Sequence, residues 1–325
     1  MLRRLAALVV VLCAMAPFRA LAADQDVHIG QGGQALYGSL MRPETPRTGV
    51  AVLILAGSGA VDRNGDELRA GITAQNLKLI ADGLAANGVI SLRIDKRGVG
   101  ESAPAAPSLP DLRLQTYVDD AVSWAGFLRA QPGVGCVVIL GHSEGALIAA
   151  LAARKVETCG VVSISGAGRD FGAVIENQLL DQGAPAPALA RVHAIIVSLR
   201  AGQAVADIPP PLLNLFRPGV QPYLMSEINI DPADELSKVR SPVLIVQGDN
   251  DLQVKVEDAQ RLAAAQPRAQ LVIIKGMNHM LKLAPPDRPG NLATYANPDL
   301  PLAPGVVSAI VALVDATPSR DHGVM

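Results

Sequence analysis

The chain has 325 residues, half of them apolar, and a formal net charge of −2 at pH 7. This length and apolar content allow a large core in one domain, or in one domain with an insertion. The near-neutral charge gives no reason to expect a nucleic acid or an anionic membrane surface as partner. Aromatic residues make up 3% of the chain, so an aromatic platform that stacks bases or sugars is not expected.

Residues 1–22 have the pattern of a secretory signal peptide. Basic residues 1–4 precede an apolar stretch over 5–15 and a small-residue cleavage site, Ala-Leu-Ala, at 20–22. The apolar stretch is short for a membrane span. We therefore expect cleavage after Ala22, a periplasmic or secreted mature protein and no stable membrane insertion after cleavage; an uncleaved anchor is the alternative.

The next part of the chain alternates strand and helix patterns with short turns between them. Continuous apolar stretches predict strands buried on both faces, and amphipathic stretches predict the helices that cover them. The regular alternation predicts an α/β fold, a mostly parallel sheet with helices on both faces. Strands are expected at 34–41, 49–55, 89–94, 136–140, 160–165, 242–247 and 271–275, and helices at 73–86, 114–130, 146–153, 256–265 and 306–314.

Between the two blocks of alternation lies a proline-broken stretch with helical patches at 171–180 and 189–199. We interpret 169–240 as a helical cap insertion over a core made of 23–168 and 241–316, with a frayed tail at 317–325. The apolar side chains of the insertion either line an acyl pocket or anchor it to the sheet: Phe171, Ile175, Leu179, Leu212, Leu213, Leu215, Phe216, Leu224 and Met225.

The most informative motif is Gly-His-Ser-Glu-Gly at 141–145, between a predicted strand and a predicted helix. In this context the motif predicts a sharp turn that raises the hydroxyl of Ser143 above the sheet as a nucleophile. Glycine is needed at both ends because a side chain there would collide with the neighbouring strand or helix.

A serine nucleophile needs a histidine to take its proton and a carboxylate to hold that histidine. Asp251 and His279 each follow a predicted strand, in the chain order serine, acid, histidine that α/β-hydrolases use. We choose Asp251 over Asp249 because the residue directly after the strand glycine is usually committed to the turn. Taken singly, a turn aspartate and a loop histidine would be ordinary interpretations of these two residues.

The oxyanion formed during acyl transfer needs two N–H donors. One is expected from Glu144, at the start of the helix after the nucleophile. The other is expected from the glycine-rich loop after the strand at 49–55, where Ser58 is our choice and Gly57 or Gly59 are alternatives. This loop lacks the lysine and spacing of a phosphate loop, and no zinc motif is present, so we expect no cofactor and no metal.

Two cysteines follow the signal segment. Cys136 and Cys159 each begin a predicted strand, and consecutive parallel strands would bring them to the same edge of the sheet. A disulfide there would suit an oxidising compartment; two buried free thiols are the alternative. Among the other histidines, His142 is expected to pack within the turn, His193 to be structural and His28 to precede the sheet.

Four segments together resemble bacterial α/β-hydrolases of the esterase-like or serine-aminopeptidase-like group. They are AGSGAVDRNG at 56–65, RIDKRGVGES at 93–102, GHSEG at 141–145 and GDNDLQV at 248–254. The resemblance implies the α/β-hydrolase fold and cofactor-free hydrolysis of carboxylic esters, sometimes of thioesters or amides. It implies the same triad, Ser143, Asp251 and His279, with oxyanion donors at Ser58 and Glu144. Ala56 departs from the pattern, since many members have histidine there.

We therefore expect an enzyme, a carboxylesterase-type serine hydrolase that acts on small or medium esters through an acyl-enzyme. A peptidase or amidase on the same triad is the first alternative, and it would need an acidic group for a charged peptide end. The insertion offers Glu176, Asp181, Asp207 and Glu227. A non-catalytic binding protein of the same fold is the second alternative. The sequence leaves the oligomeric state open.

Overall fold

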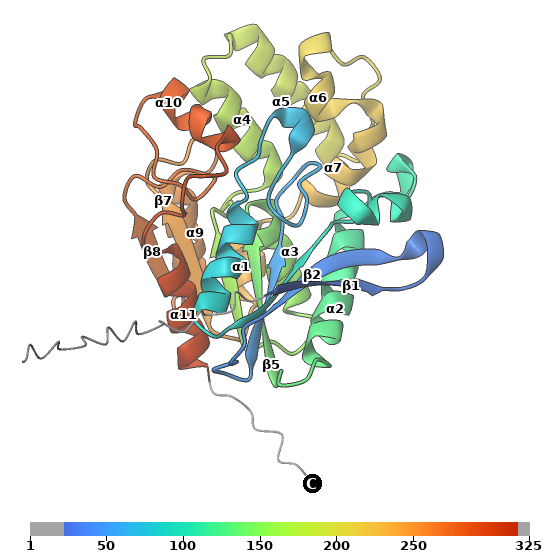
Figure 1. Cartoon of the computed structure of the whole chain (residues 1–325). Helices are drawn as coiled ribbons and strands as arrows, with labels where there is room; N and C mark the ends of the chain where they lie inside the picture. Colours follow the sequence, from blue (N-terminus) through green and yellow to red (C-terminus); the bar gives the residue numbers. More distant parts are fainter. Residues whose placement is uncertain (1–22, 318–325) are drawn as a thin grey trace, which may run out of the picture.

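The computed structural model describes residues 23–317, which form one eight-stranded sheet with helices on both faces (Figure 1). The strand order is β1-β2-β4-β3-β5-β6-β7-β8, in which β2 pairs antiparallel with both of its neighbours and all other pairs are parallel. This confirms the predicted mostly parallel sheet. The strands are β1 Ala23–Ile29, β2 Leu36–Arg42, β3 Val50–Leu55, β4 Ile90–Ile94, β5 Cys136–His142, β6 Gly160–Ile164, β7 Val243–Gly248 and β8 Gln270–Ile274.

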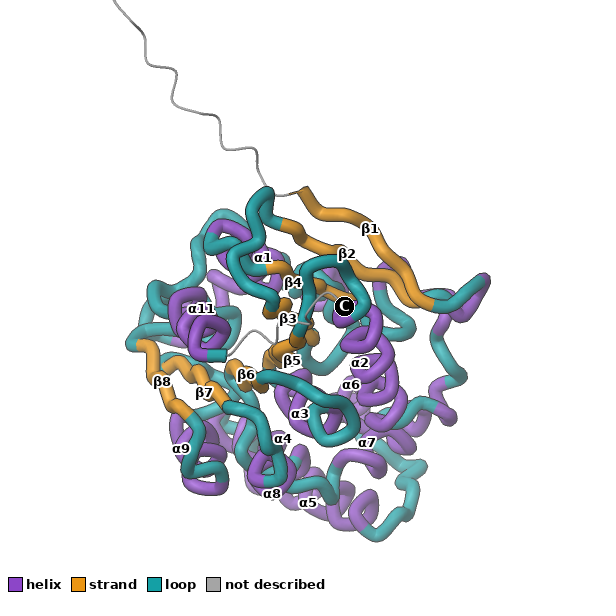
Figure 2. Tube along the Cα trace, turned by 90° about the horizontal axis from the view of Figure 1, so that it is seen from below, coloured by secondary structure: helices purple, strands orange, loops and turns teal. Residues whose placement is uncertain are grey.

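Helices cover both faces of the sheet, as the end-on view of Figure 2 shows. They pack there in two separate apolar clusters, one on each face. One cluster joins the sheet to α1 and α11, and the other joins it to α2, α3, α8 and α9. The helices of the core are α1 Asn76–Ala86, α2 Leu114–Arg129, α3 Glu144–Ala152, α8 Pro232–Ser237, α9 Val256–Ala265, α10 Arg288–Ala293 and α11 Val306–Ala316.

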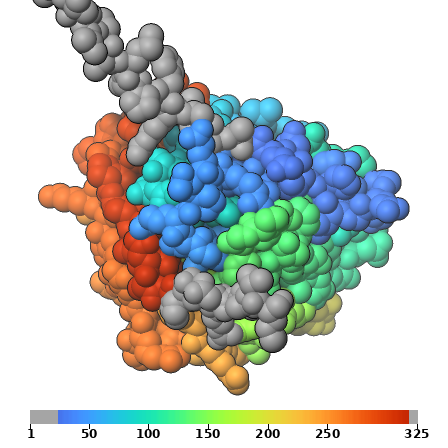
Figure 3. Space-filling model, turned by 60° about the horizontal axis from the view of Figure 1, so that its bottom comes forward, coloured from blue at the N-terminus to red at the C-terminus, as the bar shows by residue number. Residues whose placement is uncertain are grey.

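The antiparallel edge of the sheet differs from the sequence-based expectation. His28 does not precede the sheet; it lies in β1, where its ring is 5.8 Å from that of Tyr37 in β2. The pattern hid β1 because Asp24, Gln25 and Asp26 are exposed residues of an edge strand, so the strand has no apolar run. The β1–β2 segment, dark blue in Figure 3, forms one margin of the molecule. The short helix α10 was likewise not expected.

Helices α4 Phe171–Asp181, α5 Ala186–Arg200, α6 Leu213–Phe216 and α7 Gln221–Glu227 lie over the carboxyl end of the sheet (Figure 1). They share an apolar cluster of their own, which includes Ile195, Leu199 and Phe216. Helix α8 also lies within the predicted insertion but does not pack with these four helices. Its Ala233 and Leu236 belong to the cluster that joins the sheet to α2, α3 and α9. We call α4 to α7 the cap.

Cys136 and Cys159 form a disulfide at the amino ends of β5 and β6, with their Cα atoms 5.9 Å apart. At the other end of the chain, Thr317 is buried and its hydroxyl donates to the carbonyl of Leu313, so the predicted fraying does not include it. The expected signal peptide at 1–22 and the rest of the tail, 318–325, lie outside the described residues. Within the described range, no helix is long and apolar enough to cross a membrane.

Candidate active site

Ser143 lies on a strained turn between β5 and α3. Its backbone has φ 56° and ψ −124°, a left-handed conformation that costs free energy in a non-glycine residue and persists when its surroundings enforce it. A Cβ on Gly141 would come within 1.9 Å of the Gly145 carbonyl oxygen, and one on Gly145 within 2.7 Å of the Leu55 and Ala56 oxygens. The two glycines are therefore required by the close approach of backbone from α3 and from the end of β3.

Asp251 and His279 meet on the loops that follow β7 and β8. The Nδ1 of His279 is 2.9 Å from Oδ2 of Asp251, and both side chains are buried. Because an ionised carboxylate only accepts hydrogen bonds, Nδ1 carries the proton and Nε2 is free to accept one. Burial would raise the pKa of Asp251, but His279 and the backbone N–H groups of Gln253 and Val254 outweigh it and lower the pKa below its usual value.

The other aspartate of the same loop has a different role. Asp249 Oδ1 accepts a hydrogen bond of 2.6 Å from the backbone N–H of Gly276, which joins the loops after β7 and β8. The buried amide of Asn278 holds the loop of His279 from the other side. Its Nδ2 donates to Oδ1 of Asn291 at 3.1 Å and to Oγ1 of Thr294 at 2.6 Å, in and just after α10. Asp249 thus holds the turn and Asp251 faces the histidine.

His142 packs against His279, with ring centroids 4.8 Å apart. Its Nε2 lies 2.8 Å from the carbonyl oxygen of His279 and donates to it. Burial, together with the neighbouring His279, lowers the pKa of His142 to about 3, so its ring stays neutral near pH 7. A neutral, hydrogen-bonded ring in this place restrains His279 without adding a competing charge.

The expected oxyanion donors lie on either side of Ser143. Gly57 approaches so closely that a Cβ on it would be 3.0 Å from Cβ of Ser143. The carbonyl of Gly57 belongs to the same peptide unit as the N–H of Ser58, and the ammonium of Lys96 donates to that carbonyl. Among the hydrogen bonds of residues 23–317, the backbone N–H groups of Ser58 and Glu144 have no protein acceptor, so both remain available to a substrate oxygen.

Lys96, which follows β4, belongs to a buried polar cluster behind the nucleophile. Its Nζ lies 4.0 Å from Oε2 of Glu144 and 5.4 Å from the ring centre of Tyr117. Tyr223, from α7 of the cap, donates to Oε1 of Glu144 at 2.9 Å. Burial lowers the pKa of Lys96 and the charge of Glu144 opposes that effect. Sequence reasoning missed this cluster, although the position of Lys96 just after a strand of the sheet was a usable signal.

Two adjoining cavities contain Ser143. The larger, of about 390 Å³, lies under the cap, and the smaller, of about 100 Å³, also includes His142 and His279. Of the nine apolar insertion residues named from the sequence, the larger cavity is lined by Phe171, Ile175, Leu215 and Leu224. Leu212, Phe216 and others pack in the cap's own cluster, to which Ile175 and Leu224 also belong. These side chains therefore hold the cap helices together and do not anchor them to the sheet as the second interpretation expected.

The four acidic residues proposed for a peptide end differ in position. Glu227 is buried and lines the larger cavity. Glu176 pairs with His193 and Asp207 with Arg191 within the cap, and Asp181 pairs with Lys255, which precedes α9 of the core. None of these three lines the cavity with Ser143. Glu227 is therefore the acidic candidate that reaches the site.

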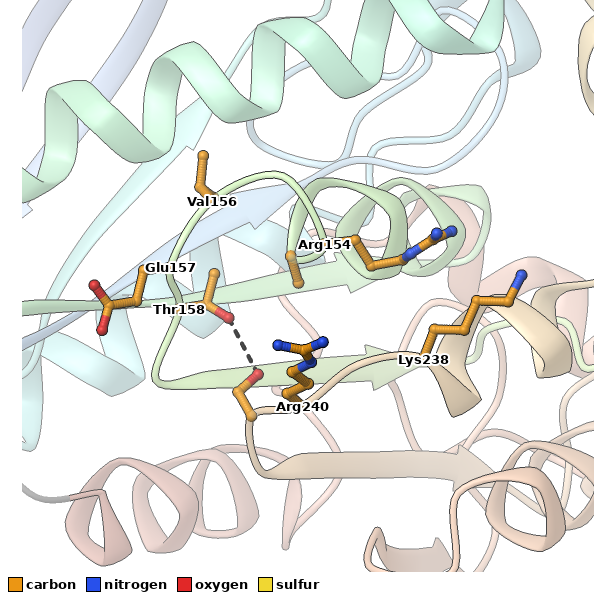
Figure 4. A pocket seen from close by; sticks show the side chains of 8 residues that line it. Arg154, Val156, Glu157, Thr158, Lys238 and Arg240 are labelled. Carbon is orange, nitrogen blue, oxygen red and sulfur yellow. Dashed lines mark hydrogen bonds between the residues drawn. The ribbon is translucent and has the colours of Figure 1, made fainter.

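A separate hollow of about 560 Å³ lies at the opposite end of the sheet, where Thr158 and Ser241 precede β6 and β7 (Figure 4). Their hydroxyls are 3.1 Å apart. The charged side chains around it are exposed, and Arg154 and Lys238 pair with Glu235. No histidine of the described residues lines this hollow to activate the two hydroxyls. Within residues 23–317, no group of three or more His, Cys, Asp or Glu side chains is placed to hold a metal.

Known proteins resemble this chain along most of its length. Esterase EstD of Thermotoga maritima is 27% identical over 251 residues, which cover 76% of this chain but only 58% of EstD. Est1E of Butyrivibrio proteoclasticus, solved with ferulic acid, superposes with a TM-score of 0.57 at 20% identity, covering 89% of this chain and 99% of Est1E. The Pyrococcus furiosus esterase Pf2001 superposes with a TM-score of 0.55 at 18% identity, covering 83% of this chain and 87% of Pf2001.

These superpositions show the fold, and the family follows from the sequence itself. The model of the alpha/beta hydrolase family matches residues 52–294, which contain the Ser143 turn, the cap and both loops that carry Asp251 and His279. The chain belongs to the alpha/beta hydrolase family.

Proposed function

We propose that this protein hydrolyses carboxylic esters of small or medium size through an acyl-enzyme on Ser143. The observation that carries the proposal is a buried His279, held by Asp251 at 2.9 Å, that lines one cavity with the strained Ser143. This is the arrangement that activates a serine hydroxyl. The likeness to EstD supports the choice of an ester substrate.

The reaction takes two steps. Nε2 of His279 accepts the proton of Ser143 as Oγ attacks the ester carbonyl, and the N–H groups of Ser58 and Glu144 stabilise the oxyanion. The bond to the alcohol then breaks, and His279 returns the proton to the departing oxygen. A water that gives its proton to His279 attacks the acyl-serine. The bond between Oγ of Ser143 and the acyl carbon then breaks, His279 returns the proton to Oγ, and the carboxylic acid leaves.

The test combines activity with active-site labelling. Purified protein should hydrolyse p-nitrophenyl esters and should be labelled by a fluorophosphonate at Ser143. Ser143→Ala should lower kcat by about 10⁶-fold without lowering thermal stability, because the residual rate comes from binding and the oxyanion donors alone. Ser123→Ala, which removes an exposed hydroxyl from α2, is the control. Retained hydrolysis in Ser143→Ala would overturn the assignment, and faster hydrolysis of an aminoacyl anilide than of its ester would favour the peptidase alternative.

We also propose that the chain is exported and cleaved after Ala22. The disulfide between Cys136 and Cys159 supports this proposal, since disulfides persist in oxidising compartments. Expression of the full chain in a Gram-negative host should yield a periplasmic protein whose amino terminus is Ala23. Recovery of the uncleaved chain in the membrane fraction would contradict the proposal.

A further inference from the structure

The two cavities at Ser143 offer separate places for the two parts of an ester. The smaller cavity includes His279, and the larger one, under the cap, does not. On the proposed function, on which this inference rests, His279 delivers a proton to the departing alcohol, so the alcohol lies on its side. The acyl group therefore occupies the larger cavity, between the core and the cap.

The larger cavity contains a carboxyl group without a hydrogen-bond partner. Glu227, the last residue of α7, is 4% exposed and lines this cavity. Its Oε2 has no hydrogen-bond partner among the described residues. A buried polar atom without a partner is unfavourable and uncommon in folded proteins, which makes it a sign of a missing ligand or water.

The neighbouring groups do not supply that partner. The ammonium of Lys96 is engaged by the carbonyl of Gly57 and lies 4.0 Å from Glu144. The hydroxyl of Tyr223 donates to Oε1 of Glu144 at 2.9 Å and so is not available to Glu227. Burial and the nearby charge of Glu144 raise the pKa of Glu227 well above its usual value, and Lys96 opposes this only in part. Glu227 therefore suits an uncharged polar partner better than a second cation.

We propose that Glu227 binds a hydroxyl group on the acyl part of the substrate, so that esters of hydroxy acids are preferred over their alkyl counterparts. A hydroxyl both donates and accepts, so it satisfies a carboxyl group in either protonation state. The apolar side chains of Phe171, Ile175 and Leu224 in the same cavity would cover the hydrocarbon between the hydroxyl and the ester. A site built to bind a hydroxyl discriminates strongly against an analogue that lacks it.

The test compares p-nitrophenyl esters of matched chain length that end in a hydroxyl, a methyl or an ammonium group, over a series of lengths. At the length that reaches Glu227, the wild-type kcat/KM should favour the hydroxyl over the methyl ester by about tenfold or more. Glu227→Met should abolish this preference, whereas Glu227→Gln should keep most of it, since an amide also donates and accepts. Glu176→Met, an exposed cap variant, should leave the ratio unchanged.

The outcomes separate this inference from the proposed function. Equal rates for hydroxyl and methyl esters at every length in the wild type would overturn the inference, even if Glu227→Met does not fold. A folded Glu227→Met that keeps the preference would also overturn it, as would a preference for the ammonium ester. The proposed function itself fails if no ester is hydrolysed and Ser143 is not labelled by a fluorophosphonate, or if Ser143→Ala retains hydrolysis.

Discussion

The loops at the carboxyl ends of the parallel strands, which we call the sheet edge from here on, and the cap both contribute to the cavity at Ser143. The two regions hold their residues in place in different ways. At the sheet edge, the backbone approaches Gly141 and Gly145 so closely that the turn at Ser143 cannot shift without collisions. A buried hydrogen bond fixes Asp251 and His279 relative to each other. The cap packs around its own apolar cluster and meets the edge through contacts such as that of Tyr223 with Glu144.

This difference separates chemistry from substrate choice. The candidate triad residues depend on backbone positions that cannot shift without collisions, whereas much of the wall of the larger cavity comes from the cap, which packs around an apolar cluster of its own. Changes at the sheet edge should therefore lower the rate for every ester, and changes in the cap should alter which ester is preferred. Single substitutions on either side can break or sharpen this division.

Asp251→Asn should cause the largest of these losses, about 10⁴-fold in kcat. An amide facing Nδ1 of His279 can donate to it, and the histidine would then carry its proton on Nε2, where it cannot accept one from Ser143. Initial rates with several p-nitrophenyl esters measure the effect, which should be uniform among them. Asp249→Asn is the control, since its side-chain oxygen can still accept from Gly276.

The pKa of Asp251 gives a second readout of the same contact. Its pKa in the folded protein is below the usual 3.8, so the carboxylate adds stability that is present above pH 3.8 and is lost as the pH falls through the folded-state value. The difference in unfolding free energy between the wild type and Asp251→Asn should therefore shrink as the pH falls below 3.8. A near-normal kcat in the variant would contradict the assigned role.

Breaking the disulfide should lower the free energy of unfolding of the protein by about 3 kcal/mol, because Cys136 and Cys159 close a loop with a sequence separation of 23 residues. Ester preference should not change. Cys136 begins β5 and Ser143 follows its end, so the two are about 20 Å apart along the strand. Chemical unfolding of Cys136→Ala/Cys159→Ala against the wild type measures the loss. Two titratable thiols in the unreduced mature protein would show that the bond does not form.

Lys96→Met should lower kcat by about 10²-fold, comparable to the loss of one oxyanion donor. Lys96 holds the carbonyl of Gly57, whose peptide plane also sets the direction of the Ser58 N–H. It acts as a positioning residue, so kcat should fall for all esters while KM changes little. Lys78→Met, which removes a partly exposed ion pair with Asp82, is the matched control. A wild-type kcat in Lys96→Met would show that Ser58 is positioned without it.

Sequence reasoning succeeded where the position of a residue depends on local pattern. The turn at Ser143 is specified by neighbouring glycines, and Asp251 and His279 each follow an apolar strand, so parallel pairing brings their loops to one edge. The expected strands and the expected helices are all present for the same reason. These features need no knowledge of contacts between distant segments beyond the order of strands in a parallel sheet.

It failed where position depends on contacts between distant segments. The β1 strand has no apolar run, because it is an exposed edge that pairs through its backbone. Lys96 and Glu144 lie far in sequence from Tyr223 and Glu227, which are both in α7, and these groups come together because α7 docks onto the start of α3. A charged residue in a cap helix looks the same in sequence whether it faces solvent, like Glu176, or a cavity, like Glu227.

Tyr223→Phe should have the smallest effect of these substitutions. It removes one hydrogen bond to the carboxylate of Glu144, so it should lower the free energy of unfolding by about 1–2 kcal/mol. Burial and Glu144 hold the pKa of Tyr223 well above 10.0, so the wild-type hydroxyl remains a donor throughout the pH range of an esterase assay. Since this contact joins α7 to the sheet edge, its loss should raise KM and weaken discrimination between acyl groups, with kcat nearly unchanged.

The matched control is Tyr117→Phe. Tyr117 is a neighbouring tyrosine whose ring is 5.8 Å from that of Tyr223, but its hydroxyl faces the carbonyl of Arg97 instead of Glu144. If Tyr223→Phe lowers kcat uniformly, as Lys96→Met is expected to do, then the contact with Glu144 serves the oxyanion site and the cap is not a separate unit. If KM and acyl preference change while Tyr117→Phe leaves both unaltered, the docking of α7 sets the shape of the acyl cavity.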